Sequence, residues 1–264
     1  MTRQKTLPRG LATAVACVAL GLGMAWGSAP AAAGDFRLIA ELWNFGQWNV
    51  DGSREDTIVF RSYQDVGLGD GWSVTFREEL PLIMTDKVGT ENPDGEWVNG
   101  MGDIFVQGVV STPEWLPDTR FEVGLRALFP TGGPSPFGGS TYQLGPMLGV
   151  SYRIEDVFDG IVLHPNVRYL MSVAETEPDA TEVRKIQVYP NINVKFSEDW
   201  ELGFWIDEPI VLDRETQEWF VPFDVTLHWT FAPGATLKFG GSVNMTDNDS
   251  SYRHVIHTAL SFSF

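Results

Sequence analysis

Hydrophobic and polar residues alternate position by position along most of this chain. The pattern is clearest over residues 219–231, where large apolar side chains occupy every second position and Asp224, Thr226 and His228 lie between them. Successive side chains of a β-strand point to opposite faces, so this segment predicts a strand with one apolar and one mostly polar face. Residues 185–196 show the same pattern nearly as clearly. The chain therefore predicts long β-strands whose two faces meet different surroundings.

The same alternation continues along the chain and predicts about twelve strands in total. They are expected at residues 36–45, 55–66, 72–84, 101–112, 119–129, 142–154, 162–173, 185–196, 200–207, 219–231, 235–245 and 252–264. The first three are less regular, and Glu78 falls on the apolar face of its strand. A bulge or a different strand register is expected at that position.

The connections between these strands alternate in length. Those after even-numbered strands, such as 67–71 and 232–234, are short, whereas 85–100 and 130–141, after odd-numbered strands, are longer. Acidic residues cluster in some of the long connections. A transmembrane barrel with both chain ends in the periplasm has short periplasmic turns and longer outer loops. The pattern predicts an all-β, antiparallel, up-and-down transmembrane β-barrel in a bacterial outer membrane, with both termini periplasmic and acidic loops outside.

The last strand ends on an aromatic residue at the C-terminus. Within 252–264, one face carries Ile256, Leu260 and Phe262, and the chain closes on Phe264. This ending resembles the signal by which outer-membrane barrels are recognised for assembly. It implies recognition by the barrel-assembly machinery and pairing of the last strand with the first, near Phe36. Outer-membrane lipid and lipopolysaccharide are then the expected surroundings.

The first 33 residues have the layout of a cleaved secretory signal peptide. A basic start is followed by an uncharged run from Leu11 and by Ala31-Ala32-Ala33, small residues of the kind found at cleavage sites. An uncleaved membrane helix is the alternative, but the Gly, Ser and Pro content and the Ala-x-Ala end favour cleavage. The expected division is therefore a leader over 1–33 and a barrel over 34–264. The single cysteine, Cys17, falls in the leader, so the barrel is expected to contain no disulfide.

Composition excludes some functions and supports a barrel. The net charge of −17 argues against nucleic acid as a partner, because phosphate binding requires a basic contact surface. After residue 33 no apolar run is long enough for a membrane-spanning helix. Ten Trp and seventeen Phe suit the aromatic girdles of a membrane barrel, although they would also suit a large soluble β core.

Charged residues of both signs recur on the polar faces of the predicted strands. The candidates for lining the barrel lumen are Arg61, Arg77, Glu79, Asp103, Glu122, Arg126, Arg153, Arg168, Lys195, Asp224 and Lys238. Charges in a narrow lumen are costly unless they are paired or hydrated. Two interpretations follow and can hold together: ion pairs that fill and stiffen the interior, or a hydrated, mildly cationic path that selects solutes. Barrels of about twelve strands lie between filled and open ones, so a narrow pore is compatible with the fold.

An enzymatic function is disfavoured by the histidines. Some barrels of this size are lipid hydrolases, in which a Ser nucleophile follows its His base by two residues on one strand face. None of His164, His228, His254 and His257 has Ser at that spacing. His254 and His257 also lie on opposite faces, which disfavours a shared metal site. We expect no catalytic residues, no metal and no cofactor.

Three short stretches resemble a family of outer-membrane transporters named for the meta-pathway of phenol degradation. Gly100-Met101-Gly102-Asp103 is similar to the Gly-x-Gly-Asp strand start of that family, and Pro130-Thr131-Gly132 to its Pro-Thr-Gly loop start. Tyr142-Gln143-Leu144-Gly145-Pro146 then opens the next strand as in those proteins. The resemblance covers mainly residues 100–155. It implies passive or facilitated passage of small solutes, with aromatic or hydrophobic organic compounds as candidates.

Two functions remain open from the sequence. One is an outer-membrane channel or transporter for small solutes. The other is a structural or adhesive barrel whose lumen is closed by its own ion pairs and whose acidic outer loops bind ions or a partner. The measurement that separates them is conductance through the folded protein.

Overall fold

The computed structural model describes residues 36–155, 160–178, 180–246 and 252–264, and the expected leader lies outside these ranges. All regular secondary structure in the described residues is β-strand. The strands are β1 (Phe36–Asn49), β2 (Arg54–Gly69), β3 (Trp72–Thr85), β4 (Val98–Met101), β5 (Ile104–Ser111), β6 (Thr119–Phe129), β7 (Thr141–Ile154), β8 (Ile161–Leu163), β9 (Asn166–Glu175), β10 (Arg184–Tyr189), β11 (Ile192–Lys195), β12 (Trp200–Phe204), β13 (Ile210–Asp213), β14 (Trp219–Phe220), β15 (Pro222–Ala232), β16 (Ala235–Asn244) and β17 (Tyr252–Ser263). Among these residues there is no helix that could cross a membrane.

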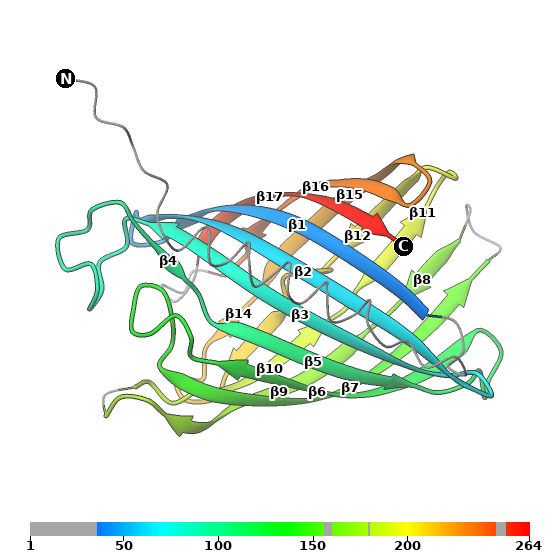
Figure 1. Cartoon of the computed structure of the whole chain (residues 1–264), viewed down its shortest axis with the longest axis horizontal. Coiled ribbons are helices and arrows are strands. Elements are labelled where there is room, and N and C mark those ends of the chain that lie inside the picture. Colours follow the sequence, from blue (N-terminus) through cyan, green and yellow to red (C-terminus); the bar gives the residue numbers. More distant parts are fainter. Residues whose placement is uncertain (1–35, 156–159, 179, 247–251) are drawn as a thin grey trace.

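These segments form one closed antiparallel barrel of twelve strands, some of them interrupted (Figure 1). The barrel closes between β1 and β17, which pair from Ile39 opposite Ser263 to Asn49 opposite Tyr252. Closure gives every strand two hydrogen-bonded neighbours, so the sheet has no free edge. The predicted fold class is confirmed, and so is the predicted pairing of the last strand with the first.

The interruptions occur where the backbone cannot continue the ladder. His164-Pro165 separates β8 from β9, and Pro190-Asn191 separates β10 from β11. Proline has no N–H to donate, and Asn191 has a φ of 37°, which lies outside the extended region. Between β12 and β13, residues 205–209 leave the strand altogether. This last interruption brings Asp207 into the interior of the barrel.

The barrel is apolar outside and polar inside. On β6 and β7, Val123 and Leu148 are each 60% exposed, whereas Arg61 is 4% exposed and Asp224 is fully buried. A water-soluble domain buries its large aliphatic side chains and exposes its charges. The reversal seen here matches a barrel whose outer wall faces hydrocarbon.

Both described ends of the chain lie at the same end of the barrel, opposite the long loops (Figure 1). The loops after odd-numbered barrel strands include 86–97 and 130–140, as predicted. The first, 50–53, is shorter than expected because β1 and β2 extend beyond their predicted limits. Its tightness has a local cause, since the backbone N–H and the hydroxyl of Ser53 both donate to Asp51 Oδ1, at 2.9 and 2.6 Å. These hydrogen bonds lower the pKa of the Asp51 carboxyl.

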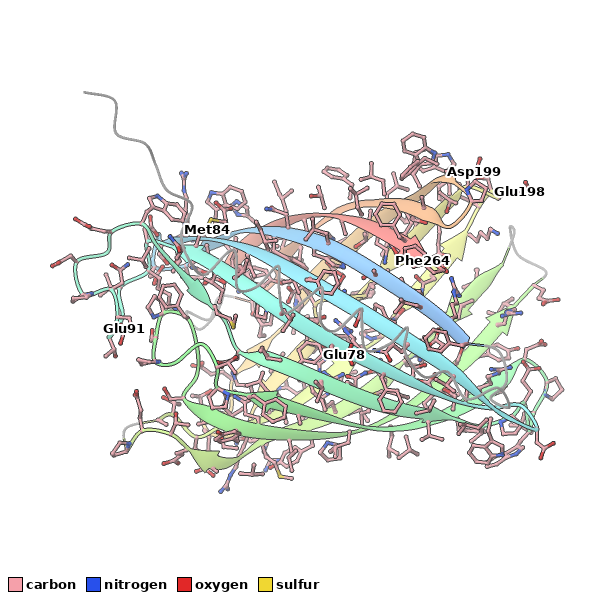
Figure 2. The ribbon with its side chains drawn as sticks, viewed as in Figure 1. Glu78, Met84, Glu91, Glu198, Asp199 and Phe264 are labelled. Atoms are coloured by element: carbon pink, nitrogen blue, oxygen red, sulfur yellow. The ribbon has the colours of Figure 1, made fainter. Side chains whose placement is uncertain are left out.

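The bulge expected at Glu78 is absent. Glu78 pairs in regular register with Ser62 on β2 and with Val106 on β5, and the nearest β2–β3 irregularity is at Gly67/Gly69. Its side chain therefore lies on the outer wall, about midway along β3 (Figure 2). The hydroxyl of Ser62 and the amide of Gln64 donate to the Glu78 carboxylate, the latter at 3.3 Å. These two neighbours satisfy the carboxylate in place, so the strand has no need to bulge.

Tyr252 also differs from its prediction. Alternation along 252–264 assigns it to the apolar outer face, yet it is 6% exposed and its hydroxyl lies 2.8 Å from the Ser242 hydroxyl. The β1–β17 register shifts between Trp48 and Asn49, where one residue of β17 is skipped. The shift turns Tyr252 inward, while Ile256 and Leu260 keep their predicted outward position.

Candidate functional site

A network of charged side chains crosses the barrel interior. The guanidinium of Arg61 on β2 lies 2.5 Å from Glu79 Oε1 on β3 and 2.8 Å from Asp207 Oδ1. Asp207 comes from the interruption between β12 and β13, which does not neighbour β2 in the sheet. The Arg61–Asp207 pair therefore spans the lumen. Arg77 joins the network through Glu79 and lies 3.9 Å from Asp207.

Glu41 connects this network to the closing strands. Its carboxylate accepts hydrogen bonds from Trp43 Nε1 at 2.7 Å and from Lys238 Nζ at 2.6 Å. Arg61 and Lys238 also lie over the Trp43 ring, at 4.7 and 5.2 Å from its centroid. A tryptophan face attracts cations, so this indole holds two positive charges beside one carboxylate. The result is a stiff, largely charge-balanced cluster against one part of the wall.

The arginines next to Arg77 along the wall are arranged differently. Arg126 Nε and Arg168 Nη2 both donate to Gln107 Oε1, at 3.2 and 3.0 Å. Arg126 lies 4.0 Å over the Phe105 ring, and Arg168 also donates to Tyr189 Oη at 3.4 Å. Within the described ranges neither guanidinium forms an ion pair with a carboxylate. Two positive charges thus share one neutral amide.

A glycine gives Arg168 the room to reach Gln107. Arg168 is on β9 and Gln107 on β5, with β6 and β7 between them. On β7, a Cβ added to Gly145 would lie 2.8 Å from Arg168 Cδ. Any larger residue at this position would collide with the arginine stem. The Gly-Pro step at 145–146 therefore lets Arg168 lie across β7 towards β5.

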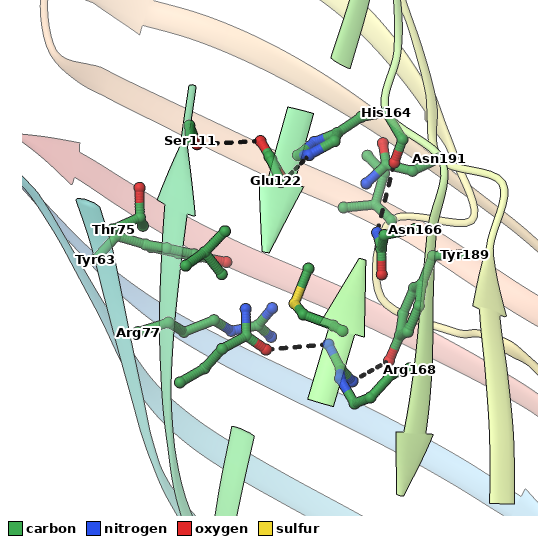
Figure 3. A pocket seen from close by; sticks show the side chains of 14 residues that line it. Tyr63, Thr75, Arg77, Ser111, Glu122, His164, Asn166, Arg168, Tyr189 and Asn191 are labelled. Atoms are coloured by element: carbon green, nitrogen blue, oxygen red, sulfur yellow. Dashed lines mark hydrogen bonds and ion pairs between the residues drawn. The ribbon is translucent and has the colours of Figure 1, made fainter. Parts of the chain in front are cut away.

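A cavity of about 230 Å³ opens beside this pair (Figure 3). Arg77 and Arg168 lie at one end of it, where Arg168 bonds to Gln107, and Glu122 and His164 lie at the other. His164 Nε2 is 2.7 Å from Glu122 Oε2, and Ser111 Oγ donates to Glu122 Oε1 at 3.5 Å. The cavity walls also include Tyr63, Tyr189, Asn166 and Asn191. We take this cavity as the candidate functional site, together with Arg126, which donates to the cavity residue Gln107.

The cavity does not have the geometry of a Ser–His catalytic pair. The Ser111 hydroxyl donates to the Glu122 carboxylate, which stands between Ser111 and His164. A nucleophilic serine instead needs the histidine ring within hydrogen-bond reach of its own hydroxyl. The arrangement is suited to holding polar groups of a solute.

The other predicted lumen residues occupy separate positions. Asp224 is fully buried on β15 and accepts a hydrogen bond from Ile206 N at 3.1 Å, which anchors the segment that carries Asp207. Lys195 and Arg153 line a hollow at the barrel end that holds the short turns. Arg153 is mostly exposed there and lies 3.8 Å from Glu155.

Asp103 holds one of the long loops, 130–140, in place. Its two carboxylate oxygens accept hydrogen bonds from the backbone N–H groups of Gly132 and Gly139, at 3.0 and 2.9 Å. The Thr131 hydroxyl donates to Gly102 O at 2.9 Å and accepts from Ile104 N at 3.0 Å. Two of the three short motifs that carried the family resemblance are thus bonded to each other, and together they fix the start of loop 130–140.

Several residues of the site carry no charge, and the pattern of charged residues in the sequence does not predict them. Gln107 and Tyr189 were not singled out, although both lie at alternate, polar-face positions of their strands. The lumen candidates are predicted from their charge alone. A neutral amide that bonds to two arginines is therefore not predicted. Trp43 was missed for the opposite reason, since an aromatic residue in an outer-membrane barrel is expected on the outer wall.

Comparison with solved structures identifies the fold. The chain is similar to the COG4313 outer-membrane channel from Pseudomonas putida F1, with 10% sequence identity and a TM-score of 0.63 over 90% of this chain and 97% of that one. It is also similar to the NanC porin (11%, TM-score 0.54, 85% and 98%) and to the KdgM porin in complex with disordered oligogalacturonate (11%, TM-score 0.50, 86% and 99%). At these identities the likeness shows the fold, that of an outer-membrane β-barrel.

No family model and no curated protein sequence matches the chain. The resemblance to the transporter family named for phenol degradation therefore stays a prediction. The structural neighbours named above are channels and porins.

Proposed function

We propose that this barrel is an outer-membrane channel for small solutes and that it favours anions. The observation that carries the proposal is the pair Arg126 and Arg168, whose guanidinium groups share Gln107 and have no carboxylate partner in the described residues. Paired charges balance each other, as they do around Arg61. The two unpaired arginines leave a positive potential beside the cavity, which attracts anions and repels cations.

Aromatic compounds fit the same region. Phe105 already stacks against Arg126, and Tyr63 and Tyr189 line the cavity wall. Rings of this kind offer stacking surfaces at little entropic cost. Small organic anions that carry a ring are accordingly the solutes we propose, in keeping with the aromatic compounds implied by the family resemblance.

The orientation is part of the proposal. The leader over 1–33 is removed on export, the C-terminal strand ending at Phe264 engages the barrel-assembly machinery, and the long loops, among them the acidic loop 86–97 and the uncharged loop 130–140, face outwards beside lipopolysaccharide. Glu91 and Glu198 lie at opposite ends of the barrel (Figure 2). On intact cells, a membrane-impermeant maleimide should label Glu91→Cys and leave Glu198→Cys unlabelled. The reverse labelling would overturn this orientation.

Single-channel recording in planar bilayers tests the function. Folded protein should give discrete conductance steps, and a KCl gradient should give a reversal potential of the sign expected for an anion-preferring pore. Absence of conductance from protein that runs as a folded barrel on unheated gels would overturn the proposal.

That negative result would favour a second candidate, a structural or adhesive barrel. The specific observation in its favour is the Arg61–Asp207 pair, which crosses the lumen at 2.8 Å. If this pair closes the lumen, the variants Arg61→Gln and Asp207→Asn should conduct ions although the native barrel does not.

A further inference from the structure

The two ends of the cavity have different chemistry, and this difference specifies a ligand. At the first end, Arg168 is 3% exposed overall and its Nε atom is buried without a hydrogen-bond partner. Its other nitrogens bond to the neutral oxygens of Gln107, Gln187 and Tyr189. A guanidinium binds carboxylates with short, charge-assisted hydrogen bonds that are stronger than bonds to amides. This end of the cavity is suited to a carboxylate.

At the second end, Glu122 presents acceptors. One oxygen bonds to His164 at 2.7 Å, and the other has a single long contact of 3.5 Å to the Ser111 hydroxyl. A carboxylate oxygen has two acceptor positions, so Glu122 retains capacity for a further donor. Hydroxyl groups of a ligand can supply it. A second carboxylate is disfavoured here by the negative charge of Glu122.

The cavity walls also carry neutral polar groups. The side chains of Asn166 and Asn191 line the cavity, together with the ring of Tyr63. Amides that can both donate and accept suit ligand hydroxyls, and a tyrosine face suits the flat side of a ring. The volume of about 230 Å³ lies below the usual range for drug-sized ligands, so a single ring or a short chain fits it.

From this arrangement we infer that the cavity binds a small hydroxylated carboxylic acid, with its carboxylate at Arg168 and its hydroxyls at Glu122 and the asparagines. The inference rests on the proposed channel function and deepens it, since it places a selective solute site within the path. A monosaccharide acid has the required size, single negative charge and hydroxyl groups.

Binding is measured by calorimetry on the folded barrel in detergent, with three small probes. Galacturonate should bind. Galactose lacks the carboxylate, and butyrate lacks the hydroxyls, so each should bind at least about tenfold more weakly, the effect of losing charge-assisted or neutral hydrogen bonds. Equal binding of galacturonate and either control probe would overturn the inference.

Matched variants locate the site. Arg168→Gln should weaken galacturonate binding about tenfold or more, because it removes the charge that holds the carboxylate. Arg153→Gln removes an equal charge from the exposed end of the barrel and should leave affinity unchanged. Glu122→Gln should reduce the preference for galacturonate over butyrate while leaving the galacturonate–galactose difference in place. Equal losses of galacturonate affinity in Arg168→Gln and Arg153→Gln would show a general charge effect and overturn the assignment of the binding site.

The channel function and this inference fail separately. Current through the pore in KCl tests the first, and calorimetry does not require an open pore. Conductance without galacturonate binding would overturn the inference alone, whereas binding without conductance would overturn the channel alone. A second readout of the inference is interruption of single-channel current by galacturonate, which should disappear in Arg168→Gln.

Discussion

Lys238 reaches across the last strand to Glu41, with 2.6 Å between Nζ and Oε1. In the sheet register, Lys238 lies opposite Ala259 of β17, and Ala259 lies opposite Trp43 of β1. Because Ala259 is small and inward-facing, the lysine can pass over it to the first strand. One ion pair thereby ties together the three strands that close the barrel.

Removing this ion pair should weaken the folded barrel. In Lys238→Gln the buried Glu41 carboxylate keeps Trp43 and Arg61 as partners but loses its closest cation, so we expect a loss of about 1–3 kcal/mol. The measurement is urea unfolding in lipid vesicles, followed by the mobility difference between folded and unfolded protein on gels. Lys185→Gln is the control, because Lys185 lies 3.6 Å from Asp213 at a more exposed position and such pairs contribute little. Equal losses in the two variants would contradict a special role for the Lys238–Glu41 pair.

Neighbouring glutamates on β3 should respond in opposite ways to the same substitution. Glu79 faces the lumen between Arg61 and Arg77, so Glu79→Gln leaves buried cations poorly compensated and should cost about 3–5 kcal/mol. Glu78 faces the outer wall, where a charge is unfavourable. Glu78→Gln keeps acceptor and donor groups for Ser62 and Gln64 and should leave stability unchanged or raise it. Unfolding in vesicles measures both, and a larger loss at Glu78 would contradict the assigned register.

The strand pattern could be predicted from the sequence because it is local. Residues 219–231 carry their alternation within one segment, and β14 and β15 occupy nearly that range. Tyr252 was misplaced since its direction depends on a register shift beside Trp48, two hundred positions away. Nothing in 252–264 itself records that shift.

The site was predictable in part for the same reason. Arg126 and Arg168 were found from polar positions on their own strands. Their shared contact with Gln107 depends on how four barrel strands are staggered and on the space beside Gly145. The pairing of Arg61 with Asp207 depends on the interruption after β12, which strict alternation does not predict. Long-range register therefore decides which predicted charges are paired.

Because Asp103 holds loop 130–140 through two hydrogen bonds, removing its carboxylate should make the loop more mobile. Asp103→Ala removes the acceptor for Gly132 N and Gly139 N, two hydrogen bonds to a charged group. Each contributes about 1.5–3 kcal/mol locally, so the loop should exchange its amide hydrogens at least about tenfold faster while the barrel strands stay protected. Asp94→Ala, in loop 86–97, is the control for loss of an acidic loop residue. Unchanged exchange at Gly132 and Gly139 would contradict the role assigned to Asp103.

Reversing the charge of Arg126 or Arg168 should shift ion selectivity towards cations. Each substitution by Glu replaces a positive group, unpaired by any carboxylate in the described residues, with a negative one. In a narrow path with low-dielectric walls, such a change reverses the local potential. The reversal potential in a KCl gradient should therefore move towards, and for the double variant past, the value of a non-selective pore. Arg153 lies beside Glu155 at the solvent-exposed end of the barrel, so Arg153→Glu should shift the reversal potential much less. A conducting double variant with native selectivity would mean that ions follow a path away from these arginines.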